Sequence, residues 1–262
     1  YHGIEADGLR LKNDNFADEN HKNSSMSLEK QIFIENKFLS VFNDRAFKEI
    51  LSKEDYTKYI NAKQTLFFNK GESLFEEGRN VEGVFFIESG TAKLYKLGFN
   101  RKEQILRFIK EGDIIGYRAL LIGEAYQATA EAMSDLQATY IPADVFLHLL
   151  EVDPQLSFAM LQKISFELGE SSNTVTFLAQ KTVRERLAEV LLLLEQKLGT
   201  DPEGFIKISL TREEIANLIG TATESAIRLI SEFKQDNYIE VEGRNLKILN
   251  HEKLRKLGHV VL

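Results

Sequence analysis

The 262-residue sequence predicts an α+β protein whose three parts follow one another along the chain. From about Thr65 to Ile141, short apolar runs alternate with glycines, which is typical of an antiparallel sandwich or a small barrel. After Pro154, an apolar heptad pattern predicts one long helix. From Lys181 to the end, two short helices and an alternating segment predict a smaller C-terminal domain.

Composition and charge limit the function classes. The chain lacks a signal-peptide pattern and any apolar run near the roughly 18 residues that a membrane helix needs, so we expect a cytoplasmic protein with no membrane partner. It has no cysteine, which excludes disulfides, thiolate zinc sites and iron–sulfur clusters with cysteine ligands. From Lys181 onward 13 basic residues balance 13 acidic ones, so the net charge of −7 lies in the N-terminal part. A polyanionic partner would therefore meet the C-terminal part.

The N-terminal part contains a tail, helices and strands. Residues 1–25 are polar and aperiodic, which predicts a disordered tail, and helical patterning covers residues 27–61. Strands separated by glycine turns are predicted by the apolar runs at 65–68, 83–89, 91–97, 104–109 and 136–141. Pro142 ends this region, and helical patterning resumes at Ala143.

The long helix after Pro154 carries a stripe at spacings of three and four residues. Its members are apolar except for one serine: Leu161, Ile164, Leu168, Ser171, Val175 and Leu178. The stripe could pack on the chain's own barrel, or on a second copy as a two-stranded coiled coil. We favour the second interpretation, which predicts a homodimer. Thr182 and Glu185 then match a capping box, which predicts a new helix with a candidate hinge just before it.

The C-terminal domain has the pattern of a helix-turn-helix followed by a wing. Thr211 and Glu214 match a second capping box, and Gly220 ends the helix that begins there. A second helix is expected from about residues 221–223 to Asp236. Residues 238–249 then alternate apolar and polar around Gly243, which predicts a two-stranded hairpin.

One face of the second helix suits the major groove of DNA. At about 100° per residue, the core face consists of Ala226, Leu229, Ile230 and Phe233. On the opposite face, Arg228 could bond guanine and Glu224 could accept from cytosine. The predicted DNA-binding residues are Thr223, Glu224, Ser225, Ile227, Arg228 and Ser231, with Arg212 and Arg244 as phosphate contacts; Lys181 and Arg184 are further candidates for phosphate contacts.

An ordinary structural role is the alternative for this face. Glu224 and Arg228 are spaced to form an i,i+4 ion pair, and Glu224 could also complete a capping box with Thr221. The preceding helix, the turn and the wing together favour DNA reading. The two interpretations are compatible, because such a pair can brace Arg228.

These motifs resemble the CRP/FNR family of bacterial transcription regulators over roughly residues 45–250. The family's helix-turn-helix is similar to TREEIANLIGTATESAIRLISEF, with its E-[ST]-x-x-R motif at Glu224 to Arg228. Its cyclic-nucleotide-type β-roll is similar to KGESLFEEGRNVEGVFFIESGTAKLYK, and its phosphate-binding cassette to EGDIIGYRALL. The resemblance implies an α+β fold with an N-terminal antiparallel β-roll (a double-stranded β-helix or jelly roll), a long dimerisation helix and a C-terminal winged helix-turn-helix. The expected boundaries are 1–25 for the tail, 26–153 for the roll with its flanking helices, 154–180 for the dimerisation helix and 181–262 for the DNA-binding domain.

The resemblance also implies a function. It predicts a homodimeric, sequence-specific DNA-binding transcription regulator whose two recognition helices enter successive major grooves of a pseudo-palindromic double-stranded operator. The family typically contacts RNA polymerase as well. The alternatives are a cAMP-responsive regulator and an effector-binding module that acts on a protein partner, although the second would not need the wing. An enzyme is not expected, because none of the five histidines lies between Thr65 and Ile141, where a cupin-like metal site would need them.

The cassette departs from the cAMP-binding pattern. In cAMP-binding members, a Glu after the glycine holds the ribose hydroxyl, and an Arg followed by Ser or Thr holds the phosphate. Here Tyr117 stands at the Glu position and Tyr126-Gln127 at the Arg-Ser position. A buried phosphate without a charged partner is strongly disfavoured. We therefore expect a different small effector, or none.

The candidate effector pocket is assigned by this resemblance. Arg118 lies next to Tyr117, and Ser171-Ser172 stand where hydroxyls meet the adenine in cAMP binders, although a serine in an apolar seam could equally set the register. The pocket residues are Gly116, Tyr117, Arg118, Ala119, Tyr126, Gln127, Ser171 and Ser172. Haem is not expected, because His148 is the only histidine near the roll and lies on a largely apolar helix. Thr223 replaces an arginine of the cAMP-type reader, so one base preference should differ.

Overall fold

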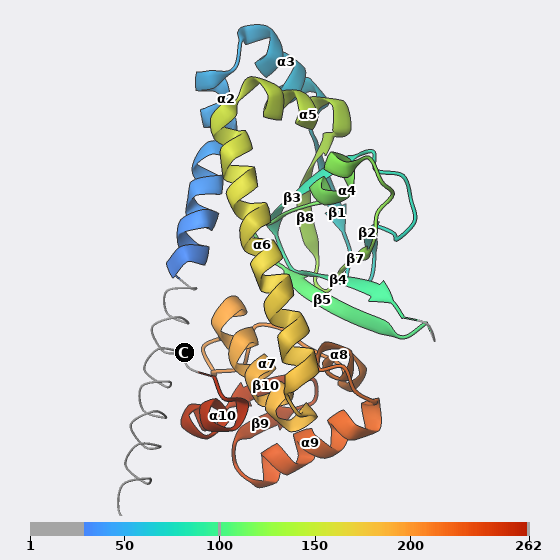
Figure 1. Ribbon diagram of the computed structural model, residues 1–262, viewed down its shortest axis with the longest axis vertical. Helices are drawn as coiled ribbons and strands as arrows, with labels where there is room; N and C mark the ends of the chain where they lie inside the picture. The colour runs from blue at the N-terminus through green and yellow to red at the C-terminus, as the bar shows by residue number, and fades with distance from the viewer. Residues whose placement is uncertain (1–28, 99–100, 261–262) are drawn as a thin grey trace, which may run out of the picture.

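The computed structural model describes residues 29–98 and 101–260 (Figure 1). The tail expected over residues 1–25 lies outside this range. The roll lies beside the upper part of one long helix, and the C-terminal domain lies at the lower end of that helix (Figure 1). Among the described residues, no helix combines the length and the apolar character needed to cross a membrane.

Two four-stranded antiparallel sheets form the roll, in the orders β1-β8-β3-β6 and β2-β7-β4-β5. The strands are β1 (Gln64–Phe68), β2 (Ser73–Phe75), β3 (Gly83–Ser89), β4 (Ala92–Leu97), β5 (Glu103–Ile109), β6 (Ile114–Ile115), β7 (Thr129–Ala132) and β8 (Leu136–Pro142). Both sheets contribute to one core, which includes Leu74, Phe85, Ile87, Ile109, Ala130 and Leu136. Five strands match the predicted runs. The three others, β2, β6 and β7, are only two to four residues long, too short to show a period.

Helices flank the roll. They are a helix over 29–41, α2 (Asp44–Ile50), α3 (Lys53–Ala62), α4 (Tyr117–Ile122) and α5 (Ala143–Val152). A second core joins several of them to the start of the long helix, with Phe38, Phe42, Phe47, Phe146 and Leu156 among its buried members. The helix over 29–41 therefore packs beside the long helix rather than standing free (Figure 1).

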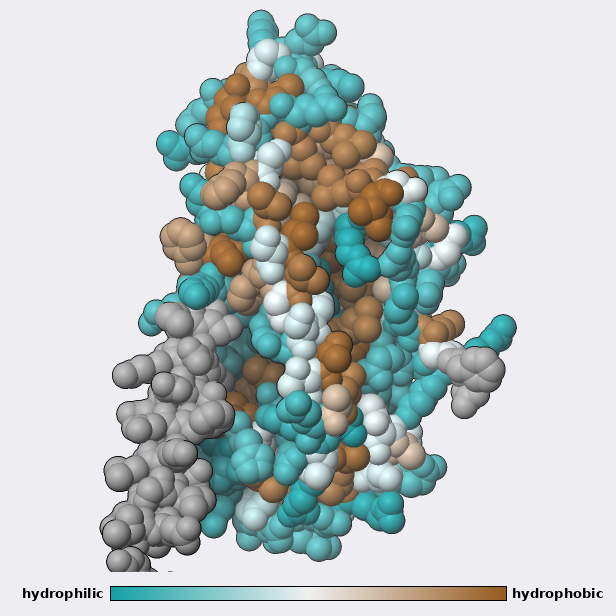
Figure 2. All heavy atoms as spheres, in the orientation of Figure 1, coloured by the Kyte–Doolittle hydropathy of each residue, from teal (hydrophilic) through white to brown (hydrophobic). Residues whose placement is uncertain are grey.

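The long helix is α6 (Pro154–Gln180), and its 27 residues span about 40 Å. Asp153 caps its N-terminus by accepting from the backbone N–H groups of Gln155 and Leu156. Residues near its start are buried against the roll, but the predicted stripe largely faces outward. Leu161, Leu168 and Val175 are 58, 69 and 67% exposed, and apolar side chains run along the visible face of the molecule in Figure 2.

The C-terminal domain is a helix-turn-helix with a wing. Its elements are α7 (Val183–Leu198), α8 (Arg212–Leu218), α9 (Thr223–Gln235), β9 (Ile239–Glu242), β10 (Asn245–Ile248) and α10 (His251–Gly258). The capping boxes predicted at Thr182 and at Thr211 are both formed. The capping box suggested for Thr221 and Glu224 was wrong, because Ala222 is the N-cap of α9 and makes no side-chain cap.

Candidate DNA-reading surface and effector pocket

The two faces of α9 separate as the sequence predicted. Ala226, Ile230 and Phe233 are buried in the core of the C-terminal domain, where helix α8 and the wing pack against them. The opposite side, here named the reading face, is exposed and consists of Glu224, Ile227, Arg228 and Ser231. The amphipathic pattern of α9 explains this exposure, because burying the apolar face of a helix leaves the opposite, polar face in solvent.

The polar groups of the reading face make few internal contacts. Arg228 donates from Nη2 to the Ser225 hydroxyl at 3.3 Å, and Ser231 donates to the carbonyl of Ile227 at 2.9 Å. Among the described residues no ion pair joins Glu224 to Arg228, so the ordinary i,i+4 pair considered above is not formed. Most hydrogen-bonding capacity of both side chains stays available to an external partner.

The basic residues around α9 differ in what they bind. Arg184 pairs with Glu232 and, at 3.1 Å, with Asp236, and Lys181 lies 2.7 Å from a carboxylate of α7. Their charges are therefore already compensated inside the protein, which argues against both as phosphate contacts. Arg212 donates to the carbonyl of Gly243 at 3.0 Å and ties α8 to the wing. Arg244, at the tip of the wing, is exposed and the best placed of these cations to meet a phosphate.

The cassette tyrosine faces the long helix. Gly116 adopts φ +89° at the start of α4, and the next residue, Tyr117, is buried and donates its hydroxyl to Glu167 of α6 at 2.5 Å. Burial and the charge of Glu167 raise the pKa of Tyr117, so the phenol stays protonated and remains a donor. The position at which the cAMP-binding pattern has Glu is thus engaged within the chain.

Sequence reasoning missed the ionic cluster around this tyrosine. Glu167 also accepts from Arg107 of β5 at 2.9 Å, and Lys163 lies 3.6 Å from both Glu167 and Asp113. The cluster joins the roll to α6 with two cations and two carboxylates. Only Lys163 and Glu167 could have been recognised beforehand, as an i,i+4 pair on a helix, because their partners lie 50 to 60 residues away in sequence.

Some of the other predicted pocket residues lie close together, since a Cβ on Gly116 would come within 3.4 Å of the Tyr126 ring. Tyr126 stacks on Phe75 with ring centroids 4.0 Å apart and donates to the carbonyl of Gly83 at 3.1 Å. It lines a hollow of about 770 Å³ at the mouth of the roll, together with aromatic side chains such as Phe85 and Tyr140 and with charged ones such as Arg79, which pairs with Glu76 at 3.5 Å. Ala119 is buried elsewhere, in α4, and the exposed Arg118 donates to Gln127 at 2.7 Å. Ser171 and Ser172 are exposed and donate to carbonyls of their own helix.

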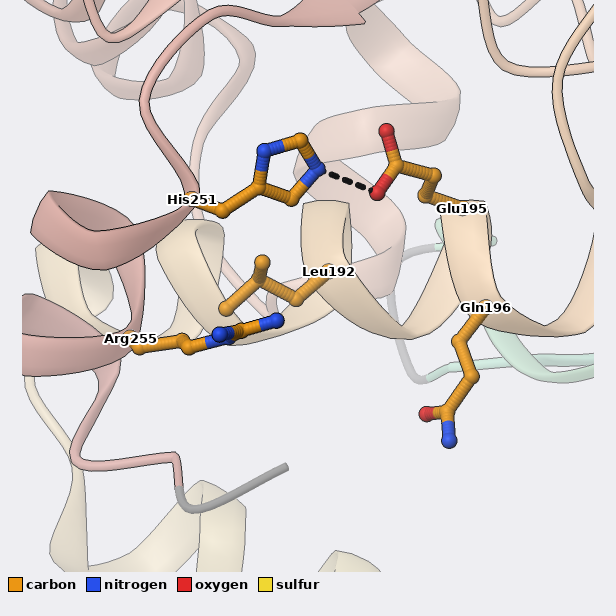
Figure 3. Close-up of a pocket in the computed structure, with 5 residues that line it drawn as sticks. All are labelled: Leu192, Glu195, Gln196, His251 and Arg255. Atoms are coloured by element: carbon orange, nitrogen blue, oxygen red, sulfur yellow. Dashed lines mark hydrogen bonds and ion pairs between the residues drawn. The ribbon is translucent and has the colours of Figure 1, made fainter.

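A smaller hollow of about 280 Å³ lies between α7 and α10 (Figure 3). His251 points at Glu195 with Nε2 2.6 Å from a carboxylate oxygen, while Gln196 points away from both. The pair fastens α10 to α7. Leu192 and Arg255 complete the lining.

Two family models match the chain. A cyclic nucleotide-binding domain covers residues 65–153, and a Crp-like helix-turn-helix domain covers residues 185–257. The chain is 30% identical to the "Fumarate and nitrate reduction regulatory protein" of Vibrio cholerae, over 73% of this chain and 77% of that protein. The chain belongs to the CRP/FNR family. This CRP/FNR protein is also 30% identical to "Electron transport regulator A" of Shewanella oneidensis, over 72% and 76% of the two chains.

Solved structures share this fold. FixK2 from Bradyrhizobium japonicum has a TM-score of 0.65 at 22% identity, over 74% of this chain and 96% of that one. The c-di-GMP responsive regulator CLP of Xanthomonas campestris has a TM-score of 0.64 at 17% identity, over 76% and 100%. Together the matches confirm the predicted family and fold class. They also confirm that the protein is a DNA-binding transcription regulator and not an enzyme.

Proposed function

We propose that this CRP/FNR regulator binds a pseudo-palindromic operator as a homodimer, with α9 of each protomer in the major groove, and that it does so without cAMP. The observation that carries the proposal is the reading face of α9, where Glu224 and Arg228 are exposed and not paired with each other. A guanidinium and a carboxylate on one helix face match the donor and acceptor pattern of a G·C pair. RNA polymerase is the further partner that family membership suggests.

The stripe on α6 supports the homodimer. Leu161, Leu168 and Val175 are mostly exposed in one protomer, although such apolar side chains are expected to be buried. Their heptad spacing suits a parallel pairing with the same helix of a second copy. A two-fold axis along this seam would place two reading faces on one side of the dimer, as a palindrome requires.

The cassette supports independence from cAMP. The cations beside Tyr117, Arg107 and Lys163, are already paired with Glu167 and Asp113. A phosphate entering there would have to displace a carboxylate and would then face it as a like charge. Tyr126 offers no charge where cAMP-binding relatives carry an arginine. An effector of another kind could still use the hollow at the mouth of the roll, which has both aromatic and charged walls.

The test is selection of operator sequences from random DNA duplexes by the purified protein. Fluorescence-anisotropy titrations of the selected duplex, with and without cAMP, then give its affinity. We expect a selected sequence with two inverted half-sites and the same affinity in both titrations. Enrichment of no sequence, or binding that appears only with cAMP, would contradict the proposal.

A further inference from the structure

The roll touches the helix-turn-helix at its turn. Gln104 of β5 donates from Nε2 to the carbonyl of Asn217, in the last turn of α8, at 2.7 Å. Lys102, just before β5, donates to the carbonyl of Thr221, in the turn between α8 and α9. The last four carbonyls of a helix have no partner inside it. The hairpin of β4 and β5 therefore satisfies backbone groups at the point from which the recognition helix starts.

The same hairpin also meets the N-terminal end of α8. Lys93 of β4 is 5% exposed, and its ammonium lies 2.7, 3.3 and 3.8 Å from the carboxylates of Glu103, Glu131 and Glu214. Glu214 completes the capping box of α8 by accepting from the backbone N–H of Thr211 at 2.8 Å. Burial alone would lower the pKa of Lys93, but the hydrogen bond to Glu103 and the charge of Glu131 outweigh it, so the pKa is raised and the ammonium stays charged at neutral pH.

These contacts hold the helix-turn-helix without covering its reading face. Apolar packing adds to them, because Met133 of the roll belongs to the core of the C-terminal domain and Phe108 of β5 packs against it. Gly220, in the turn itself, has φ +61°, and a Cβ there would lie 3.3 Å from Leu178 of α6. The turn is thus enclosed by the roll and α6, while α9 projects from it (Figure 1).

We propose that the β4–β5 hairpin is a positioning element for DNA reading, with Lys102 and Gln104 fixing the direction in which α9 leaves the turn. Only residues 181–182 separate α6 from α7, so the C-terminal domain could turn about this link if the hairpin contacts were absent. In a dimer, such turning would change the separation of the two reading faces. The inference rests on the proposed function, because the separation matters only when two recognition helices engage one operator.

The test compares a palindromic duplex, selected by the wild-type protein, with the same duplex after one half-site has been scrambled. The variant is Lys102→Met combined with Gln104→Met, which removes one contact to the end of α8 and one to the following turn, from half-buried and exposed positions. Because a scrambled duplex engages one recognition helix, it does not depend on their separation. We expect a loss of about tenfold on the palindrome and less than about twofold on the single half-site.

Three matched variants complete the design. Lys96→Met removes a charge from the same hairpin and should bind both duplexes like the wild type, because the Lys96 ammonium makes no hydrogen bond or ion pair with any described residue. Lys102→Arg keeps a donor and should bind the palindrome within about twofold of the wild type. Glu214→Gln should weaken binding to the palindrome by part of the tenfold loss. The Gln side chain can still accept the capping-box hydrogen bond, but it cannot form an ion pair with Lys93. Thermal unfolding verifies that each variant is folded.

An equal loss on both duplexes would overturn the inference, because the contacts would then serve the integrity of the C-terminal domain and not its position. Unchanged binding to the palindrome would overturn it too, and so would tighter binding, which would mean that the hairpin restrains the dimer in an incompetent arrangement. Failure of the proposed function can be told apart from failure of this inference. It would appear in the selection experiment, where the wild-type protein would enrich no sequence with two half-sites. That result would remove the inference together with the function on which it rests.

Discussion

Arg228 lies in the middle of the reading face and has only the Ser225 hydroxyl as a partner among the described residues. A guanidinium in this state has N–H groups left for a guanine, and a bidentate contact of this kind discriminates strongly between bases. Thr223, Glu224 and Ser225 precede it at the start of α9, where the first turn of a recognition helix meets base edges.

Replacing Arg228 with Ala should weaken operator binding by about 1–3 kcal/mol and relax the preference at one base pair of each half-site. Anisotropy titrations with the selected operator and with its single-base variants measure both effects. Lys234→Ala is the matched control, because it removes an exposed cation from the last turn of the same helix. If the Arg228 variant discriminated between bases as well as the control, Arg228 would not be a base-reading residue.

Tyr117 is the second residue whose role can be isolated. Tyr117→Phe removes the hydrogen bond to Glu167 and should lower the free energy of unfolding by about 1.5–3 kcal/mol, towards the lower end because Glu167 keeps Arg107. Denaturant unfolding measures this. The control is Tyr56→Phe, since the partly buried Tyr56 makes no hydroxyl hydrogen bond with any described residue. Equal stability of the two variants would contradict a structural role for the Tyr117 hydroxyl.

The sequence alone predicted the two faces of α9, but it did not predict the hydrogen bond of Tyr117. The faces of α9 follow from helical periodicity alone, so Ala226 and Arg228 could be placed on opposite sides beforehand. The sequence also showed that Tyr117 stands where cAMP binders carry Glu. It could not show that the hydroxyl would reach Glu167, because that contact depends on how α6 crosses the roll.

Among the elements, α6 connects the roll, the proposed dimer seam and the C-terminal domain. Near its start it is buried against the roll, and farther along it presents the exposed stripe. Burying a leucine contributes about 1.5–3 kcal/mol, and a symmetric dimer buries each stripe residue twice.

Leu168→Glu should therefore dissociate the dimer, with a dissociation constant raised about 100-fold or more. Analytical ultracentrifugation over a concentration series measures it. Leu168 is 69% exposed in the protomer, so the substitution should leave the folding of the single chain nearly unchanged. Asn173→Glu adds the same charge away from the stripe and should remain dimeric. A Leu168 variant as dimeric as this control would place the subunit contact elsewhere.

The capping box of α8 is a second element with a clear test. Thr211→Ala should destabilise the C-terminal domain by about 0.5–2 kcal/mol, because the Thr211 hydroxyl accepts from the backbone N–H of Glu214 at 3.1 Å. Thr221→Ala should cost less, because Ala222 and not Thr221 caps α9. Chemical denaturation monitored by circular dichroism compares the two. A larger effect at Thr221 would contradict this assignment of the caps.

Elements that carry a period or a capping signal could be predicted, and three short strands of the roll could not. The heptad spacing located α6, and the capping-box patterns located the starts of α7 and α8. Strands β2, β6 and β7 carry too few residues for a period, and their conformation is imposed by the sheets that they join. The capping box suggested at Thr221 failed because the pattern S/T-x-x-E is short enough to occur where the helix begins one residue later.

At the scale of the whole molecule, the important contacts are those between the roll and the C-terminal domain. The contacts of Lys93, Lys102 and Gln104 with α8 and the following turn join segments more than 100 residues apart. Nothing in the local sequence of the hairpin indicates them. They explain how a change in the roll could reach α9 directly, besides the route through α6.

The central claim is that two copies of α9, held at a fixed separation, read one operator. The most direct measurement inserts five base pairs between the selected half-sites, which rotates one half-site by about half a turn of DNA. In anisotropy titrations, the lengthened duplex should then bind only as tightly as the duplex with one half-site scrambled, because only one recognition helix can bind. An unchanged affinity for the lengthened duplex would contradict a dimer that reads both half-sites through α9.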